Sequence, residues 1–463
     1  MSALQVRMLA SLAIGIAASA ARAEDAGRFY ALFFDGSHAS AAVFRKDVWW
    51  SDQAMLGNRR LFGTQNPARM LQDTARCARL KGPHVVMANG DVLPGRIAGF
   101  LPASQEEDMP AHLLVSPEGS LVTADPHGVA VRAESVLRVR SNLDRPPEGE
   151  PGSLVLTGGT RLTATAIRWT DRGLKALTKN GSTMVPFDAI GELYVPEADV
   201  MRAVLDDGIY PPLGPAAVIG RLETVQGAVL TCHRDMMLVG FTKASPSAKR
   251  GSPPTAYLLA QPNWSSTMIL VPIDSIWRES FRAANEVPLS LLSAKTLSEK
   301  VGLHRWPWRR NENVEGDPLA SGDVTADLGV GTHSCCEIAF ELPPQSKEFS
   351  TLVGLDRRMG PEACATCKIY PDRVADRPLY ASGTLRGGQE PTPVGPLSVA
   401  GCQRLVLMTE WAGEGHPQDA YPLDIGGHVD WLMPFVAIEA DDASYCQSLR
   451  RFVPGWTKWG LGP

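Results

Sequence analysis

The sequence predicts a mostly β protein, with small β modules in series followed by an antiparallel sandwich or jelly roll. Three observations predict this fold class. The 463 residues include 43 Gly and 36 Pro, and Val, Leu and Thr recur in short runs, which is typical of many turns and short strands. One strand–turn–strand pattern recurs between about residues 80 and 285. Strand-like runs at fairly even spacing then begin at about residue 303.

The composition excludes some classes of function. The chain carries 45 basic and 50 acidic residues, a formal net charge of -5, and no basic run with interleaved aromatics, so we expect no nucleic-acid partner. The sequence has no HExxH, GxSxG or P-loop motif. We therefore expect a protein that is not an enzyme, although a role beside a glycoside hydrolase stays open.

The first 23 residues are typical of a signal peptide. Arg7 precedes the apolar run "MLASLAIGIAASA", and "ARA" ends at Ala23, the expected cleavage site. The alternative is an uncleaved membrane anchor, for which the run is short. We expect a secreted, periplasmic or cell-envelope protein, in which disulfides could form.

Residues 24–80 are expected to form a β-hairpin and a helix. "RFYALFFDGSHASAAVF" is hairpin-like, and "NPARMLQDTARCARL" is typical of a helix with Asn66 as its N-cap and Pro67 in its first position.

Three β modules are expected at residues 81–145, 150–200 and 218–285. "NGD" and "TGGT" are hairpin turns between apolar runs, and the closing phrases "VPFDAIGEL" and "VPIDSIWRE" correspond. Asp188 and Asp274 occupy equivalent places in these phrases. They could serve acid–base chemistry, but capping of a short turn is the favoured interpretation. "FTKASPSAKRGSPPTA" is expected to be a loop of the third module.

Residues 300–442 are expected to form the sandwich, and residues 443–463 a C-terminal tail. "SLLSAKTLSEKVG" leads into this domain as a linker or short helix. The runs "CCEIAFELP", "EFSTLVGLD", "CATCKIYPD", "RLVLMTEWA" and "HVDWLMPFVAIEA" are strand-like and separated by turn residues, which indicates the antiparallel architecture.

These runs resemble the NPCBM/NEW2 domain, a carbohydrate-binding module found beside family 98 glycoside hydrolases. The resemblance is carried by "LGVGTHS", "IAFELP", "FSTLVGLD", "CKIYPD", "LYASGTLRGG", "VAGCQRLVLMTE" and "HVDWLMPFV", in this order. It implies a galactose-binding-like jelly-roll sandwich with a non-catalytic role in binding a sugar. The loop after "TEWAGEG" is longer here than in the family, and its acidic cluster is rearranged, so sugar specificity is open.

The densest group of sugar-binding residue types lies between Trp411 and Trp431. Flat aromatic faces stack on sugar rings, and nearby polar groups bind hydroxyls. For Trp431 the alternation favours a core position, and His428 and Asp430 could form a buried hydrogen-bonded pair. The candidate carbohydrate-binding residues are Trp411, Glu414, His416, Tyr421, His428, Asp430 and Trp431.

The expected ligand is a glycan or polysaccharide, and no cofactor is expected. Carboxylates and carbonyls of the same loop could hold a structural Ca²⁺. The alternative function is a structural or adhesive cell-envelope protein whose β modules contact other envelope proteins.

The stretch "THSCCE" looks like a metal or thiol site, but strand alternation argues against it. Cys335 and Cys336 would point to opposite faces, as would Cys364 and Cys367. One of the first two could bridge to Cys364 or Cys367 on a neighbouring strand, and the other would be a small core residue. His333 is expected to be a structural hydrogen-bonder.

Overall fold

The computed structural model confirms the mostly β fold class, since nearly all of its regular structure is strand. Among the residues it describes, no helix is long and apolar enough to cross a membrane. The predicted signal peptide, with cleavage after Ala23, and the tail 443–463 lie outside the described residues. Those residues are 27–45, 53–78, 80, 82–106, 109–123, 125–141, 150–196, 198, 203, 218–234, 237–241, 256–299, 306–374, 377–411 and 426–439.

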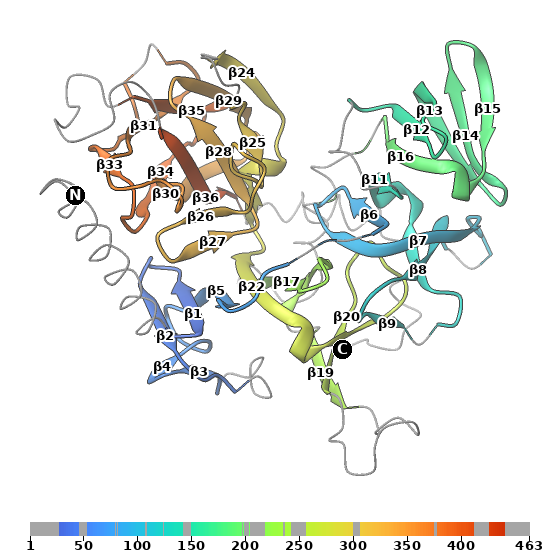
Figure 1. The fold of residues 1–463 in the computed structure, drawn as a ribbon, viewed down its shortest axis with the longest axis horizontal. Helices are drawn as coiled ribbons and strands as arrows, with labels where there is room; N and C mark the ends of the chain where they lie inside the picture. The colour runs from blue at the N-terminus through green and yellow to red at the C-terminus, as the bar shows by residue number, and fades with distance from the viewer. Residues whose placement is uncertain are drawn as a thin grey trace, which may run out of the picture. The chain divides into compact units, whose positions relative to one another are not determined.

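The chain forms two compact units, each with its own hydrophobic core (Figure 1). The N-terminal unit runs to Arg282, apart from Ala88–Gly90 and Asp199–Ala217. The C-terminal unit comprises those two segments and the chain from Ala283 onward.

The N-terminal unit opens with the predicted hairpin, but the predicted helix after it is wrong. Its elements are β1 (Phe29–Phe33), β2 (His38–Ala41), β3 (Met55–Leu56), β4 (Arg59–Arg60) and β5 (Ala68–Asp73). The segment expected to be helical from Asn66 instead forms β5, which pairs with β1 on one side and β22 on the other. All six residues of β5 are buried. Pairing and burial on both sides override the local helical tendency.

Three modules of one plan follow. Each has a first strand, a long or broken second strand, a third and a fourth strand, a three-residue 3-10 turn and a fifth strand. Module 1 contains β6 (His84–Met87), β7 (Val92–Leu101), β8 (His112–Pro117), β10 (Val129–Arg132), η2 (Ala133–Ser135) and β11 (Val136–Arg140), with the short β9 (Val122–Thr123) before β10. Module 2 contains β12 (Ser153–Leu156), β13 (Arg161–Thr170), β14 (Gly173–Thr178), β15 (Gly181–Val185), η3 (Phe187–Ala189) and β16 (Ile190–Tyr194). Module 3 contains β17 (Val218–Thr224), β18 (Val229–His233), β19 (Leu238–Phe241), β20 (Ala256–Ala260), β21 (Ile269–Pro272), η5 (Ile273–Ser275) and β22 (Ile276–Ala283).

The acidic residues that recur in the modules lie inside the 3-10 turns. Asp188 is in η3 and Asp274 in η5. The cap positions are Pro186 and Pro272, and no side chain caps either turn. The capping interpretation is therefore wrong in detail, although both residues do belong to the repeated turn.

Strand pairing joins strands of all three modules into one continuous sheet, while β19, β20, β21 and β9 form a second sheet. The fifth strands β11 and β16 of modules 1 and 2 pair antiparallel, with Val139 opposite Leu193. Modules 1 and 3 meet through β7 and β18, and β22 of module 3 pairs with β5. The modules thus share edges, which removes open strand edges from their junctions.

Modules 1 and 3 also cover each other's fourth strand. The connection before the fourth strand of module 1 contains β9, which pairs with β21 of module 3. The corresponding connection of module 3 lies along β10 of module 1: Ser265 bridges Val131, and the Arg132 N–H donates to Trp264 O at 2.8 Å. The exchange is reciprocal, because the same segment of each module covers the same strand of the other.

A buried carboxylate, Asp91, fixes this junction. It follows the β6–β7 turn of module 1, is 0 % exposed, and accepts hydrogen bonds from three residues of module 3. Arg221 Nη1 donates to Oδ1 at 2.9 Å, the Thr231 N–H to Oδ2 at 2.7 Å, and Trp264 Nε1 to Oδ2 at 2.7 Å. A buried charge is tolerated when it is hydrogen-bonded in this way.

The C-terminal unit is the predicted sandwich of two antiparallel sheets. The first sheet has the order β25 (Arg309–Arg310), β28 (Gly329–His333), β36 (His428–Ile438), β30 (Ser346–Leu355), β34 (Thr392–Ser398), with β23 (Glu286–Pro288) also paired to β36. The second has the order β24 (Ala294–Glu299), β29 (Cys336–Glu341), β35 (Arg404–Glu410), β31 (Cys364–Pro371), β32 (Tyr380–Ala381), with β33 (Leu385–Arg386) also paired to β31. The small hairpin of β26 (Leu319–Ser321) and β27 (Val324–Ala326) is separate, and η6 (Leu289–Leu291) precedes β24.

The sandwich includes two strands that precede residue 300. "SLLSAKTLSEKVG", expected to be a linker or short helix, instead supplies η6 and the edge strand β24, which pairs with β29. β23 pairs with β36.

The cysteines of this domain follow the predicted alternation, but the predicted bridge is wrong. Cys336, Ile338 and Phe340 face the sandwich core, and Ala339 packs in a separate cluster. Cys336 and Cys367 carry free thiols and lie opposite the same residue, Thr409, on its two sides. β35 thus separates β29 from β31, too far for a disulfide. Burial raises the pKa of Cys336 to about 12 and also raises that of Cys367, so both are inert core thiols.

Candidate functional site

The outer face of the first sheet carries a group of polar side chains at one end. On β36, Val429 and Trp431 point into the core, so His428 and Asp430 point to the opposite face. On β30, Val353 and Leu355 are core residues, and Asp356 directly follows the strand. The pairing places Leu355 opposite Val429, so the end of β30 and the start of β36 lie side by side.

Two glycines let loops lie directly on this face. Gly331 of β28 and Gly354 of β30 are both paired with Asp430. A Cβ at Gly331 would lie 2.4 Å from Glu312 O, and one at Gly354 would lie 2.2 Å from Ser321 Oγ. The absence of side chains at these positions therefore brings the loop after β25 onto the sheet above Asp430.

Asn313 folds that loop and connects it to β30. Its Oδ1 accepts from the backbone N–H groups of Glu315 at 3.0 Å and Asp317 at 2.9 Å. Its Nδ2 donates to Asp356 Oδ2 at 2.6 Å, and both side chains are buried. Two carboxylates on the loop are thereby held close to the start of β36.

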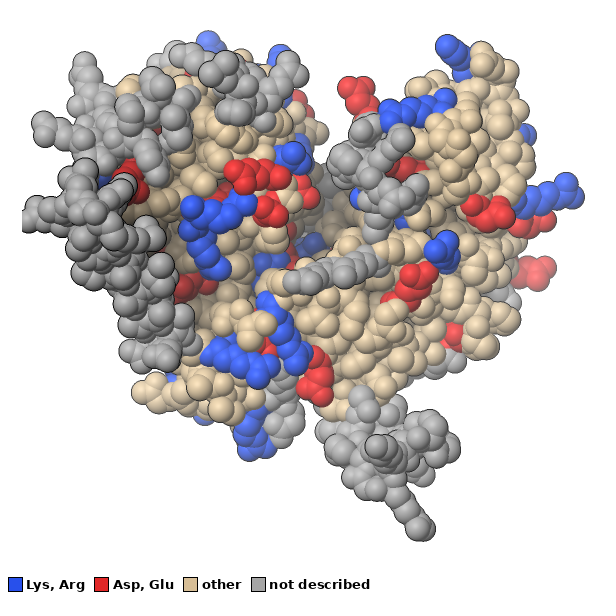
Figure 2. Space-filling model, in the orientation of Figure 1, with Lys and Arg blue, Asp and Glu red and all other residues tan. Residues whose placement is uncertain are grey.

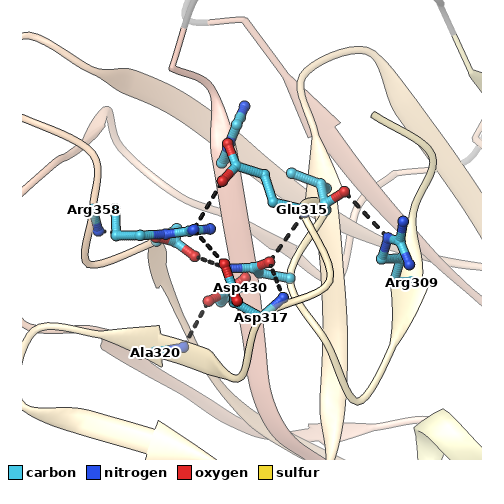
Figure 3. A network of polar contacts seen from close by, with 10 residues as sticks. Arg309, Glu315, Asp317, Ala320, Arg358 and Asp430 are labelled. Carbon is cyan, nitrogen blue, oxygen red and sulfur yellow. Dashed lines mark hydrogen bonds and ion pairs between the residues drawn. The ribbon is translucent and has the colours of Figure 1, made fainter. Parts of the chain in front are cut away.

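Arg358 lies among these carboxylates (Figure 3). Its Nη1 is 2.8 Å from Glu315 Oε2 and 2.5 Å from Asp317 Oδ2, and its Nε donates to Asp356 Oδ1 at 3.2 Å. The side chains of Arg358, Glu315 and Asp317 are 40 %, 39 % and 60 % exposed, whereas Asp356 is buried. The buried, hydrogen-bonded carboxylate of Asp356 thus orients Arg358, whose side chain is partly exposed to solvent.

Asp430 lies buried under this group. It is 1 % exposed, and its Oδ2 accepts from the Ala320 N–H at 2.8 Å (Figure 3). Burial, reinforced by the neighbouring Asp356, raises the pKa of Asp430 well above its usual range. Its role is to support the overlying loop.

Three rings adjoin the carboxylates. His333, at the end of β28, is paired with His428, and their ring centroids are 5.2 Å apart. The half-buried Trp306 stacks on His333 at 4.8 Å and meets His428 edge-on at 5.0 Å. His428 Nδ1 is 3.9 Å from Glu315 Oε1, so the rings lie near the carboxylates without a hydrogen bond from this nitrogen to them. Burial, with the charge of Arg358 and the adjacent His333, lowers the pKa of His428 to about 4, so its ring is neutral at pH 7.

This arrangement offers an arginine and two carboxylates with accessible atoms, and a half-buried indole that packs on His428, the neighbour of Glu315. Such groups bind neutral polyols, because the ring packs on C–H faces while charged donors and acceptors bind hydroxyl groups. On the side of the molecule drawn in Figure 2, acidic and basic side chains are mixed, rather than separated into one acidic and one basic region.

The predicted site residues differ in burial and in whether the structure describes them. Trp431 is 0 % exposed and packs in the core, as the alternation indicated, so its predicted sugar contact is replaced by a structural role. His428 and Asp430 are also buried, but they do not form the predicted mutual pair: Asp430 accepts from the Ala320 N–H, and His428 Nδ1 has no hydrogen-bond partner among the described residues. Trp411 is half-buried and follows β35, whose Thr409 is opposite Cys336 near the end of β28. Glu414, His416 and Tyr421, and most of the loop expected to hold Ca²⁺, lie outside the described residues.

Sequence reasoning missed Trp306, Glu315, Asp317, Asp356 and Arg358 as site residues. A faint signal existed, because "HRWPWRR" concentrates tryptophan with basic side chains, and "FSTLVGLD" ends in Asp356. Only the pairing of β28, β36 and β30 brings these segments together. Across the part of the chain that the structure describes, no three His, Cys, Asp or Glu residues form a group that could hold a metal ion.

Comparisons with known proteins identify the C-terminal domain. Residues 285–432 match the family model of the NPCBM/NEW2 domain, which confirms the resemblance seen in the sequence. No curated protein matches the chain.

Several solved structures are similar to this chain. The CBM51 of Clostridium perfringens GH95, in complex with methyl-galactose, is 23 % identical over 33 % of this chain and 99 % of its own, with a TM-score of 0.27. The CBM51-2 and INT domains of Clostridium perfringens ZmpB, with GlcNAc, are 16 % identical over 46 % of this chain and 44 % of their own, with a TM-score of 0.27.

Proposed function

Because residues 285–432 form an NPCBM/NEW2 domain, we propose that this chain is an exported, non-catalytic carbohydrate-binding protein. The proposed sugar site is the surface of Trp306, Arg358, Glu315 and Asp317. Trp411, Glu414, His416 and Tyr421 remain proposed sugar-binding residues on the basis of their residue types in the sequence.

One observation carries the placement of the site. Arg358 is fixed from below by the buried Asp356 and shares its exposed side with Glu315 and Asp317. Donor and acceptors are thus oriented before a ligand arrives, which lowers the entropic cost of binding hydroxyl groups. Trp306 adds a flat apolar surface beside them.

The proposal predicts that Arg358→Ala weakens sugar binding about 10- to 100-fold, because a hydrogen bond to a charged group is worth about 1.5–3 kcal/mol. Trp306→Ala should weaken it similarly by removing the stacking surface. A glycan array would find the ligand, and calorimetry on the full chain would give the affinities.

Arg357→Ala is the matched control, since the Arg357 Nε donates to the backbone oxygen of Gly322 rather than to the carboxylates. The proposed site is refuted if the array finds a ligand whose affinity is the same in both site variants and in the wild type. A chain that binds no glycan on a broad array would favour the structural or adhesive alternative.

A further inference from the structure

The fourth strand of module 2 is open where its counterparts in modules 1 and 3 are covered. β10 is covered by the segment around Ser265, and β21 is paired with β9. Among the described strands, β15 pairs with β14 alone and ends the sheet (Figure 1). In modules 1 and 3, the connection before the fourth strand covers the fourth strand of the other module. In module 2 this connection is only the turn of Lys179 and Asn180.

We propose that β15 pairs with β15 of a second copy of this chain, forming a two-fold symmetric dimer. The molecule itself supplies the precedent for this mode of contact. β11 and β16 are the same strand of two successive modules, and they pair antiparallel with each other. A strand that pairs with its own equivalent is what a two-fold axis produces between identical chains.

The edge of β15 lacks the usual protection against such pairing. Its sequence, GSTMV, contains no charged residue and no proline, and its first four residues are exposed. Met184 is 45 % exposed, and Leu177 on the adjacent β14 is 49 % exposed. Met184 is paired with Lys175 and Ser182 with Leu177, so the two apolar side chains share one face. Exposed, uncharged edges of this kind favour strand addition.

The hairpin geometry sets the register. Thr178 and Gly181 close a two-residue turn, so the alternation of the ladder directs the N–H and C=O groups of Ser182 and Met184 away from β14. An antiparallel pair centred on Thr183 sets Ser182 of one copy opposite Met184 of the other. The outward N–H and C=O groups of Ser182 and Met184 in each copy are then all hydrogen-bonded. The Met184 side chain of each copy lies on the same face as Leu177 and Met184 of its partner.

Sedimentation velocity on the full chain, from about 1 µM to about 1 mM protein, tests the dimer. The wild type should shift from monomer to dimer within this range. Ser182→Pro removes one outward N–H without touching the β14 ladder, and Met184→Lys places a charge at the edge. Each variant should remain monomeric while its far-UV circular dichroism stays that of the wild type.

Two further variants check the interface itself. Leu297→Lys makes the same kind of change at an exposed apolar residue of β24, 44 % exposed, and should leave the dimer intact. Thr183→Cys should form a covalent dimer on mild oxidation, because equivalent residues at the two-fold axis lie within disulfide reach, whereas Ser182→Cys should do so far less. A wild type that stays monomeric overturns the proposal. So does a dimer that survives in whichever of the two edge variants folds, or one that Leu297→Lys abolishes.

Discussion

At the scale of single residues, the proposed site depends on buried groups that support the exposed ones. Asp356 orients Arg358, and Asp430 accepts a hydrogen bond from the loop above it. His428 lies beneath Trp306 as a neutral ring. Burial raises the pKa of Asp430 and lowers that of His428, so the exposed surface is sensitive to pH through residues that it covers.

The pKa of His428 predicts acid sensitivity of the sandwich. Its pKa is about 4 in the folded protein, against about 6.5 in the unfolded chain. Because the folded value is lower, His428 contributes stability that is present above pH 6.5 and lost as the pH falls through 4. The loss approaches about 3 kcal/mol, at about 1.4 kcal/mol for each pKa unit.

Hydrogen exchange of β36 between pH 7 and pH 4 would measure this loss as a lower free energy of opening, after correction for the intrinsic exchange rate. In His428→Asn the change between the two pH values should be smaller by most of that amount, whereas His38→Asn, at an exposed position of β2, should behave as the wild type does. An unchanged pH dependence in His428→Asn would contradict the assignment.

Alternation along a strand predicted the core positions of Trp431 and Cys336, because one side of each strand must be apolar. It could not predict the neighbours of Asp430. Those neighbours come from loops whose close approach depends on Gly331 and Gly354. In a single sequence, a glycine that permits such a contact cannot be distinguished from a glycine in a turn.

At the scale of elements, the close approach of the loop after β25 depends on missing side chains. Gly331→Ala would place a Cβ 2.4 Å from Glu312 O and 2.5 Å from Asn313 Cα, both backbone atoms that cannot rotate away. The loop must then move, carrying Glu315 and Asp317 with it.

We therefore predict that Gly331→Ala lowers sugar affinity by about tenfold or more while the sandwich remains folded, since two of the ligand's polar partners are displaced. Calorimetric titration and circular dichroism would measure the two effects. Gly383→Ala is the control, because a Cβ there meets nothing within 4 Å. Equal affinity in the two variants would show that the loop does not form the site.

Turn chemistry predicted the hairpins, but it did not exclude the helix that was wrongly predicted from Asn66. "ARMLQD" satisfies helical preferences locally, yet β1 and β22 lie on both sides of it. The second of these partners is about 200 residues away in the sequence, so no local pattern reports it.

At the scale of the whole molecule, the modules depend on one another. The repeat was visible in the sequence, but the exchange between modules 1 and 3 was not, because β9 has only two residues and its partner lies far along the chain.

Asp91→Ala should destabilise the N-terminal unit by about 3–5 kcal/mol, because it removes the carboxylate partner of the largely buried Arg221 and the acceptors of the Thr231 N–H, the Thr231 hydroxyl and Trp264 Nε1. Urea unfolding of the full chain would measure it as a lower midpoint of one transition. Asp171→Ala, in the exposed β13–β14 turn, should leave both transitions in place. A change below about 1 kcal/mol would mean that the modules hold together without this network.

The reciprocal cover between modules 1 and 3 has a consequence for how the chain is made. When the ribosome has completed module 1, the segment that will lie along β10 has not yet been synthesised, since Ser265 comes more than 130 residues after its partner Val131. Module 2 is finished in between and can complete its own hairpins first. The nascent N-terminal unit therefore carries an incomplete first module until its third module emerges, and its assembly is timed by the last of the three rather than by the first.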